Sequence, residues 1–265
     1  MNELLLAFIL GIIEGLTEFL PVSSTAHLRI AQSYLGIPLE DEFWKLFAIV
    51  IQLGAVISVL FYFKARILAV LKGQQKLLLI KLAIAFSATV VPVLFLRKLA
   101  SHNLESLNII SLALIIGCIV MIIIDKLPQK AMTIESLDHK QSAFIGLFQA
   151  LAAIFPGVSR SMATIVGGQV LGLSRKEAVE FSFLLSIPTM LAATTYDLIQ
   201  AYFQGPVLIQ QLQERWDVLG MGMITSFIVA LFVIAWFMKW VRTKSFVAFG
   251  VYRIIFGLYI LLTHI

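Results

Sequence analysis

Long apolar segments run through this chain, and they constrain its fold more than any other feature. Six of them reach the roughly twenty residues that a helix needs to cross a bilayer. They span residues 43–63, 77–97, 105–125, 177–199, 217–238 and 246–264. The chain is 60% hydrophobic and 13% charged, whereas soluble domains are about 25% charged. The sequence therefore predicts an all-α, polytopic membrane protein that forms one integral membrane domain over residues 1–265.

Two further apolar regions are too short and too interrupted to cross the membrane in the same way. In each region a proline break separates two short helices. The pairs are residues 1–20 and 24–36 around Pro21, and residues 141–155 and 160–172 around Pro156. Broken backbone at membrane depth is tolerated only where protein buries it or where it lines a wet cavity. We therefore predict two re-entrant helical hairpins in addition to six transmembrane helices.

The two hairpins also match each other in sequence. A shift of 135 residues, from Gly11 to Gly146, lays GIIEGLTEFLPVSST on GLFQALAAIFPGVSR without a gap. The matched pairs include Glu14 with Gln149, Pro21 with Pro156, and Ser24 with Ser159. Because a hairpin adds no crossing and three spans follow it, the second copy is inverted relative to the first. The sequence predicts inverted-topology repeats over about 1–126 and 139–265, an arrangement typical of transporters.

The basic residues predict which way the chain is oriented. Under this topology one membrane face is much richer in lysine and arginine than the other, and the positive-inside rule places that face in the cytoplasm. The richer face holds Lys64, Arg66, Lys72, Lys76, Lys126, Lys130, Lys140, Arg175, Lys176, Lys239, Arg242 and Lys244. The poorer face holds mainly Lys45, Arg97, Lys98 and Arg215. Both termini and the mouth of the first hairpin are then extracytoplasmic. Residues 1–20 as a full span would break this asymmetry.

Composition excludes two other classes of function. The net charge of +5 does not indicate a nucleic-acid partner, because no basic run is interleaved with aromatic residues. The single cysteine, Cys118, excludes a disulfide framework and a cysteine-based metal site. We therefore expect membrane lipids and no nucleic acid around this chain.

The first hairpin carries two carboxylates in an otherwise apolar helix. Glu14 and Glu18 are four residues apart and so share one helix face. Ionisable groups at membrane depth are costly and usually functional. Such a pair can hold a divalent cation through oxygen ligands, or one member can accept a proton. The alternative is that each carboxylate only caps a helix or forms a structural ion pair.

Three hydroxyl residues and a histidine follow the proline break. Helix capping explains one of Ser23, Ser24 and Thr25 but not all three. Free amides at a helix start make an anion site. His27 follows Ser24 by three residues, and a Ser–His pair within reach is the minimum unit of an activated nucleophile. A structural role for the histidine is the alternative.

The second hairpin adds a cation at its own break. Arg160 stands at a helix start beside Ser159 and Ser161, with Thr164 one turn further on. A guanidinium held there can bind phosphate through two parallel hydrogen bonds. The alternative is a salt bridge to Glu14 or Glu18. Together the two breaks predict a site for phosphate esters or anhydrides, with a lipid phosphate as substrate.

Five motifs of the chain resemble one family across nearly its whole length. They are EGLTEFLPVSSTAH at 14–27, VIQLGA at 50–55, PGVSRSMATI at 156–165, FSFLLSIP at 181–188 and YRIIFG at 252–257. The family is that of the undecaprenyl-pyrophosphate phosphatases, the bacitracin-resistance phosphatases of bacterial membranes. The resemblance implies hydrolysis of a C55 isoprenyl diphosphate to undecaprenyl phosphate and inorganic phosphate, which recycles the lipid carrier for peptidoglycan. It also implies the bacterial cytoplasmic membrane, an extracytoplasmic active site, and a divalent cation, Mg²⁺ or Ca²⁺.

The resemblance assigns roles by position. Glu14 and Glu18 match the family's acidic motif and are the expected metal ligands. Ser24 matches the family's nucleophile, and His27 matches the partner of that nucleophile. Arg160 matches the arginine of the family's second motif. The expected substrate-binding residues are Ser23, Thr25, Ser159, Ser161 and Thr164. Ser24 would attack the distal phosphorus, assisted by His27 or a glutamate, and direct attack by water stays open. The chain departs from the family pattern at Ala26, Ala48 and Met162, none of which is a proposed catalytic group.

Two other functions remain in view. Inverted repeats with an anion site also fit a transporter or flippase of lipid phosphates, which would need no nucleophile. A structural membrane subunit would leave the buried charges of both hairpins unexplained. For both the phosphatase and the transporter, the expected ligand is a polyprenyl diphosphate lipid. The sequence leaves open whether the chain forms a homodimer.

Overall fold

The computed structural model describes residues 2–100, 107–128, 130–204 and 206–263. Those residues form twelve α-helices, one short 3-10 helix and no strand, which confirms the all-α prediction for the described part of the chain. The side chains of residues 97–100 are not described, and they include Arg97 and Lys98 of the predicted basic-poor face.

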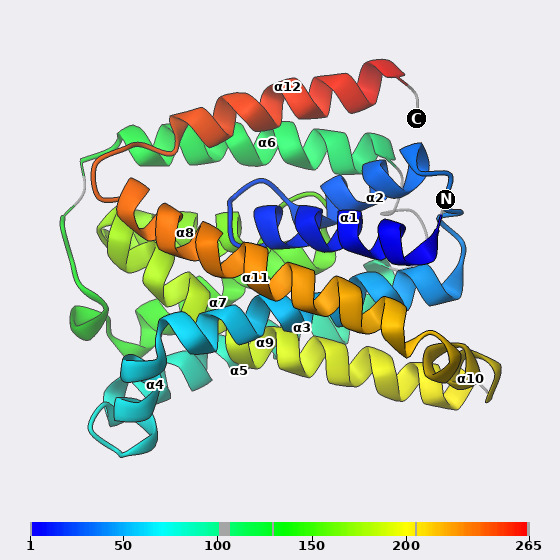
Figure 1. Cartoon of the computed structure of the whole chain (residues 1–265). Helices are drawn as coiled ribbons and strands as arrows, with labels where there is room; N and C mark the ends of the chain where they lie inside the picture. The colour runs from blue at the N-terminus through cyan, green and yellow to red at the C-terminus, as the bar shows by residue number, and fades with distance from the viewer. Residues whose placement is uncertain (1, 101–106, 129, 205, 264–265) are drawn as a thin grey trace.

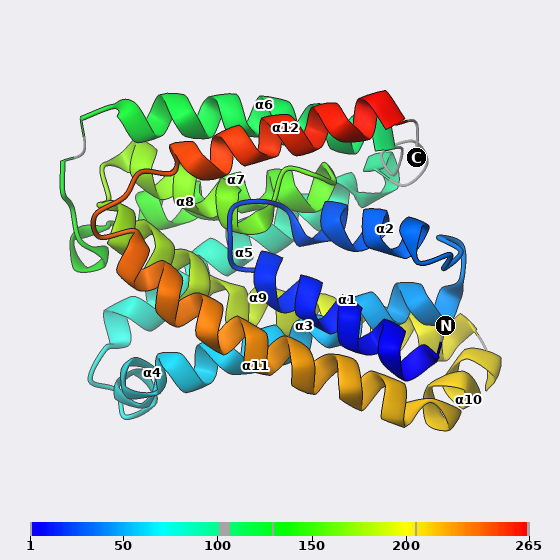
Figure 2. The same ribbon diagram turned by 45° about the horizontal axis from the view of Figure 1, so that its top comes forward.

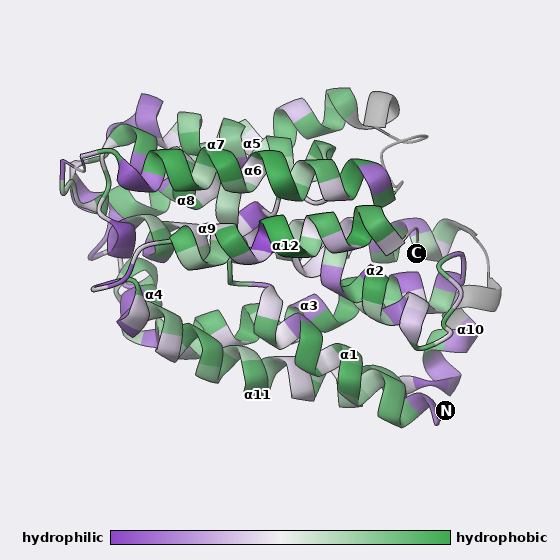
Figure 3. Cartoon of the chain, turned by 90° about the horizontal axis from the view of Figure 1, so that it is seen from above, coloured by the Kyte–Doolittle hydropathy of each residue, from purple (hydrophilic) through white to green (hydrophobic). Residues whose placement is uncertain are grey.

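Five helices are long and apolar enough to cross a membrane. They are α3 (Glu42–Tyr62), α5 (Lys76–Ala100), α6 (Leu107–Lys126), α9 (Arg175–Gln204) and α11 (Trp216–Trp240). Figure 3 shows that hydrophobic residues cover these helices and that hydrophilic residues gather mainly at the two ends of the bundle. These spans make the chain a multi-pass membrane protein. The sixth predicted span forms α12 (Val247–Thr263), an apolar helix of 17 residues that is shorter than the other five.

Two helix–break–helix units complete the bundle. The first joins α1 (Glu3–Thr17) to α2 (Ser24–Tyr34), and the second joins α7 (His139–Ile154) to α8 (Arg160–Leu171). The four helices have 15, 11, 16 and 12 residues, each fewer than a crossing needs. In Figure 2, α1 runs inward from the N-terminus and α2 turns back toward the same end of the bundle. The break therefore lies inside the protein.

The two breaks differ by one residue. Ser23 precedes α2 and Ser159 precedes α8, and both have a backbone φ of 73°. Their separation is 136 residues (159 − 23), so the structural equivalent of Ser159 is Ser23 and not Ser24 as the gapless match predicts. The shift in register falls between the prolines and the serines, where two residues separate Pro156 from Ser159 and one separates Pro21 from Ser23. Gly157 lies in that stretch with φ of 93°, and a Cβ there would lie 2.5 Å from the Ile110 carbonyl oxygen, so only glycine fits the position.

Polar residues set several helix starts. The side chain of Asn2 accepts a hydrogen bond from the Leu4 amide at α1, and Asp41 accepts one from the Trp44 amide at α3. Asp138 and Gln141 form a complete capping box at the start of α7. These caps satisfy amides that would otherwise have no partner, and so they determine where each helix enters the bundle.

The helices pack so that the two breaks meet. Helix α1 lies along α11, α3 packs on α11 and α9, α5 on α7, and α12 on α6 (Figure 1). Phe19, directly after Glu18, is fully buried and makes an edge-to-face contact with Phe183 of α9, with ring centroids 5.0 Å apart. This contact anchors the end of α1 against the spans that surround the second hairpin. Three further elements that the span pattern did not predict are α4 (Lys64–Leu71), a 3-10 helix (Ile134–Ser136) and α10 (Pro206–Glu214).

Close helix contact at Gly146 gives a testable prediction about stability. A Cβ at this residue of α7 would lie 2.1 Å from the Ala85 carbonyl oxygen of α5. We expect Gly146→Ala to destabilise the protein by about 1–3 kcal/mol through overpacking and to lower its apparent Tm in detergent by a few degrees. Gly220→Ala is the matched control, because a Cβ there would meet no described atom within 4 Å beyond its chain neighbours and the local backbone of α11. Equal Tm values for the two variants would contradict the prediction.

Candidate functional site

A cavity of about 570 Å³ lies where the two breaks meet, a size typical of small-molecule sites. Both breaks contribute polar side chains to its lining: Glu18, Ser23, Ser24, Thr25, Ser159 and Arg160. The spans contribute apolar residues, which include Val90, Val93 and Leu94 of α5 and Met190, Ala192 and Ala193 of α9. The cavity is therefore polar at the breaks and apolar along α5 and α9.

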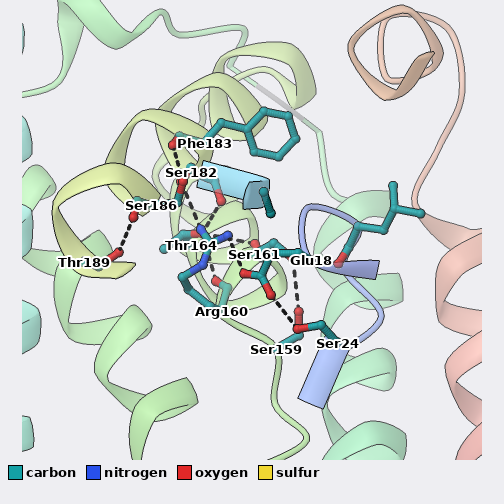
Figure 4. Close-up of polar contacts among 12 residues, drawn as sticks. Glu18, Ser24, Ser159, Arg160, Ser161, Thr164, Ser182, Phe183, Ser186 and Thr189 are labelled. Atoms are coloured by element: carbon teal, nitrogen blue, oxygen red, sulfur yellow. Dashed lines mark hydrogen bonds and ion pairs between the residues drawn. The ribbon is translucent and has the colours of Figure 1, made fainter. Parts of the chain in front are cut away.

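Glu18 connects the two hairpins through hydrogen bonds to both. The Ser24 hydroxyl donates to Glu18 Oε2 at 2.5 Å, and Arg160 Nη2 donates to Glu18 Oε1 at 3.1 Å (Figure 4). Ser24 and Glu18 are 8% and 7% exposed, so these charge-assisted bonds are screened little by water. The carboxylate thus accepts from the serine of one hairpin and the guanidinium of the other.

Arg160 retains donors that the protein does not use. Its Nη1 donates to the Ser182 carbonyl oxygen at 3.2 Å, and its guanidinium lies over the Phe19 ring at 5.8 Å. Its buried Nε has no hydrogen-bond partner in the described part of the chain. The salt bridge that the sequence left as an alternative is therefore present, and it leaves N–H groups of the guanidinium for an anion in the cavity.

Helix N-termini add positive potential at the same place. Ser24 begins α2 and Arg160 begins α8, and both residues line the cavity together with the preceding serines, Ser23 and Ser159. Each start presents free amide groups and the positive end of a helix dipole. Because Arg160 carries a full positive charge beside them, the cavity is suited to a multiply charged anion such as a diphosphate.

Glu14 lies behind this cavity and not in its lining. Its side chain is fully buried one turn before Glu18, and the two carboxylates interact electrostatically. Neither carboxylate oxygen of Glu14 has a hydrogen-bond partner among the described residues. Burying two neighbouring carboxylates without a shared cation or proton is costly. The pair therefore fits a divalent cation, although no cluster of three or more His, Cys, Asp or Glu side chains occurs in the described ranges.

The predicted pair of Ser24 and His27 is not formed. Ser24 is the first residue of α2, and its hydroxyl points back to Glu18. The His27 ring lies one turn on and stacks against the rings of Tyr252 and Phe256 of α12, at centroid distances of 5.6 and 4.3 Å. His27 does not line the cavity. Sequence spacing placed both residues on one face, but the contact with α12 turns the imidazole away.

Two predicted substrate-binding residues also have other partners. Ser161 donates to the Leu20 carbonyl oxygen at 2.8 Å, and Thr164 donates to Ser182 Oγ at 2.6 Å (Figure 4). Neither residue lines the cavity, because each lies on a buried face of α8 that packs on a neighbouring segment. They join the second hairpin to the first break and to α9. Ser23, Thr25 and Ser159 do line the cavity as expected.

Several lining residues were not assigned from sequence. The polar ones are Gln52, Thr89, Gln149, Thr189, Tyr196 and Asp197. Gln149 is 2% exposed and donates to Thr89 Oγ1 at 3.0 Å, and Thr89 contacts the carbonyl oxygens of Ala85 and Gly146, each at 2.9 Å. The available signals were the match of Gln149 to Glu14 and the presence of amides and hydroxyls inside apolar spans.

The three departures from the family pattern all lie outside the cavity lining. Ala26 is fully buried behind the first break, and Ala48 packs at the edge of a core cluster. Met162 is 4% exposed, and its terminal methyl would lie 2.7 Å from a Cβ at Gly117. Gly117 of α6 therefore leaves space for the Met162 side chain. Met162 does not narrow the cavity, because it is not part of the cavity lining.

The fold and the cavity define a multi-pass membrane protein with an internal cavity that is polar and positively charged at one end and apolar along the spans. Comparison with known sequences identifies its family. The chain belongs to the family described as bacitracin resistance protein BacA, whose family model matches residues 7–259.

Curated relatives resemble the chain over nearly its full length, and they share one printed name, undecaprenyl-diphosphatase. The relative from Koribacter versatilis is 48% identical over 280 residues, which cover 98% of each chain. One from Campylobacter jejuni is 44% identical over 259 residues, covering 96% of this chain and 92% of the relative. One from Bdellovibrio bacteriovorus is 42% identical over 260 residues, covering 97% and 94%.

Proposed function

We infer that this chain is an undecaprenyl-diphosphatase, a membrane hydrolase that converts undecaprenyl diphosphate to undecaprenyl phosphate and inorganic phosphate. Family membership and the shared name of relatives at 42–48% identity support this function. The single structural observation that carries it is the hydrogen bond from Ser24 to Glu18 beside Arg160. A nucleophile, a proton acceptor and a cation meet there in one cavity.

The chemistry that we propose uses these three side chains. Ser24 Oγ attacks the distal phosphorus while its proton passes to Glu18, which already accepts that hydrogen bond at 2.5 Å. The bond to the bridging oxygen breaks and undecaprenyl phosphate leaves. Water then attacks the phosphoserine and releases inorganic phosphate. Arg160 and the helix N-termini neutralise the charge on the phosphoryl oxygens throughout.

Glu14 and Glu18 would hold the divalent cation, Mg²⁺ or Ca²⁺, that the family resemblance implies. One or two carboxylates and the substrate phosphates are a usual ligand set for Mg²⁺. The unpartnered oxygens of Glu14 support this assignment. The cation would add charge neutralisation at the diphosphate when bound.

The apolar part of the cavity suits an isoprenyl chain. Alanine and valine side chains of α5, α7 and α9 line it, and they offer contacts without hydrogen-bonding groups. A polar head at the breaks and an apolar chain against these walls would match both halves of the lipid. Burial of the chain would contribute about 25 cal/mol per Å² of apolar surface.

We further propose six transmembrane helices, with α12 as the sixth, and two re-entrant hairpins in inverted repeats. The site would face the extracytoplasmic side of the bacterial cytoplasmic membrane. The position of the cavity along two spans supports this orientation. Its lining includes residues 90–94, in the second half of α5, and residues 189–197, in the second half of α9. Both helices begin at basic residues, Lys76 and Arg175, which the positive-inside rule favours in the cytoplasm.

Metal dependence is the experiment that tests this function. Purified protein in detergent should release phosphate from a polyprenyl diphosphate with Mg²⁺ or Ca²⁺ and should release none after chelation. Protein that binds the lipid but releases nothing under any metal would favour a carrier of lipid phosphates. Such a carrier needs the anion site but no nucleophile.

A variant of Glu14 separates the metal site from the rest of the chemistry. We expect Glu14→Gln to raise the Mg²⁺ concentration for half-maximal activity by about tenfold or more, since one ligand charge is lost. Without substrate, the rise in Tm that Mg²⁺ causes in wild type should shrink in the variant. An unchanged Mg²⁺ dependence in both measurements would remove Glu14 from the metal site.

A further inference from the structure

We propose that His27 is a positioning residue, which, together with Tyr252 and Arg253 of α12, holds the two hairpin breaks in register. This inference rests on the proposed phosphatase function, and it assigns His27 no role in proton transfer. The proton acceptor of Ser24 is Glu18, as its hydrogen bond indicates. The histidine acts on the site through the backbone of Ser23.

Both ring nitrogens of His27 are already engaged. Nδ1 contacts the Ser23 carbonyl oxygen at 2.7 Å, and Nε2 contacts the Tyr252 hydroxyl at 2.6 Å. A carbonyl oxygen can only accept, so Nδ1 carries the proton and Nε2 accepts from the tyrosine. The stacked rings of Tyr252 and Phe256 hold the imidazole in this orientation. No nitrogen of this ring is therefore left to accept a proton from Ser24.

The backbone that His27 holds is an uncommon one. Ser23 has φ of 73° and ψ of 92°, a conformation that non-glycine residues adopt only when surrounding contacts enforce it. Its own side chain makes no capping hydrogen bond to α2. The contact from His27 to the Ser23 carbonyl oxygen therefore helps to determine where α2 starts. That start in turn places Ser24 against Glu18.

Arg253, the next residue of α12, binds both breaks directly. It is fully buried, and its guanidinium donates to the carbonyl oxygens of Pro21 at 3.0 Å, Gly157 at 3.0 Å and Val158 at 3.2 Å. A Cβ at Gly117 would lie 2.8 Å from its Nη2, so α6 leaves room for the guanidinium there. Two consecutive residues of α12 therefore contact the breaks. Tyr252 holds the first break through His27. Arg253 binds the first and the second break directly.

Two substitutions of His27 distinguish positioning from proton transfer. His27→Asn can keep an amide donor near the Nδ1 position but cannot act as a base, whereas His27→Phe keeps the stacking and loses the donor. We expect His27→Asn to keep kcat for phosphate release within about tenfold of wild type, with the same pH profile. We expect His27→Phe to lose about 100-fold, because a displaced nucleophile reacts slowly.

A tyrosine variant tests the same contact from the side of α12. We expect Tyr252→Phe to lower kcat several-fold in wild type and less than about twofold in the His27→Asn background, because that variant has already lost Nε2. Tyr259→Phe is the matched control: it lies on the same helix, and its hydroxyl bonds to Tyr34 instead. Elution volume and Tm in detergent establish that each variant is folded.

The proposal would be overturned if His27→Asn and His27→Phe lost kcat equally, by about 10²–10⁴-fold, and if both lost the acidic limb of the pH profile. His27 would then be a general base. Additive effects of Tyr252→Phe and His27→Asn would also overturn the proposal. Wild type is assayed in parallel. Absence of phosphate release by wild type would contradict the phosphatase function itself, and so the two failures are distinguishable.

Discussion

Replacing Arg160 with lysine is expected to lower kcat/KM for phosphate release by roughly 10³-fold, the scale on which arginines contribute to phosphoryl transfer. The guanidinium binds Glu18 and the Ser182 carbonyl oxygen and still has an unpaired Nε. A lysine ammonium is a point charge, which cannot hold these partners and a phosphate in one planar arrangement. The charge is conserved in this variant, so the loss would report geometry.

Phosphate release at several lipid concentrations provides the measurement. Arg66→Lys is the matched control, since Arg66 forms salt bridges to Glu135 and Glu180 away from the cavity. The control should stay within about twofold of wild type, because partly exposed ion pairs contribute little. Activity of Arg160→Lys within tenfold of wild type would show that Arg160 mainly holds Glu18 in place.

Replacing Ser24 with alanine is expected to reduce phosphate release by at least about 10³-fold, because the attacking oxygen is removed. Binding of the lipid should persist, since Arg160 and the amides at both helix starts remain. The measurement pairs phosphate release with binding of the diphosphate lipid to the same protein. A radiolabelled distal phosphate would also label wild type on Ser24 during turnover.

Ser58→Ala serves as the control for this variant. Ser58 is fully buried on α3 and donates to the Ala55 carbonyl oxygen, outside the cavity lining. Retention of more than a tenth of the wild-type rate by Ser24→Ala would mean that water attacks the phosphorus directly and that Glu18 activates that water. Normal lipid transport with no hydrolysis in wild type would instead support the carrier.

Local patterns predicted much of this fold because they depend on neighbouring residues. Apolar segments of bilayer length became α3, α5, α6, α9 and α11. The helices α1 and α7 end shortly before Pro21 and Pro156, close to the predicted residues, because a proline lacks the backbone N–H that continues a helix. Proline alone does not end a helix, since Pro92 and Pro188 lie inside α5 and α9. Elements without a long apolar run, such as α4 and α10, gave a weaker pattern and were missed.

Pairing across the site was predicted less well. The sequence predicted that Ser24, Glu18 and Arg160 belong to one site. It did not predict which residue accepts the hydrogen bond from Ser24. Helical spacing makes His27 a neighbour of Ser24, and only the rings of Tyr252 and Phe256 reveal that the imidazole faces α12. A residue 225 positions further along the chain decides this orientation.

The sequence by itself determined the membrane class, the two broken hairpins and the polar residues at each break, because apolar length, proline and buried charge act locally. Only the tertiary structure decided which of those polar groups meet. It directed Ser24 to Glu18, placed Ser161 and Thr164 in buried structural contacts, and brought Arg253 to the carbonyl oxygens of both breaks. Hydrogen bonds require specific distances and directions between atoms, and packing of distant helices sets both.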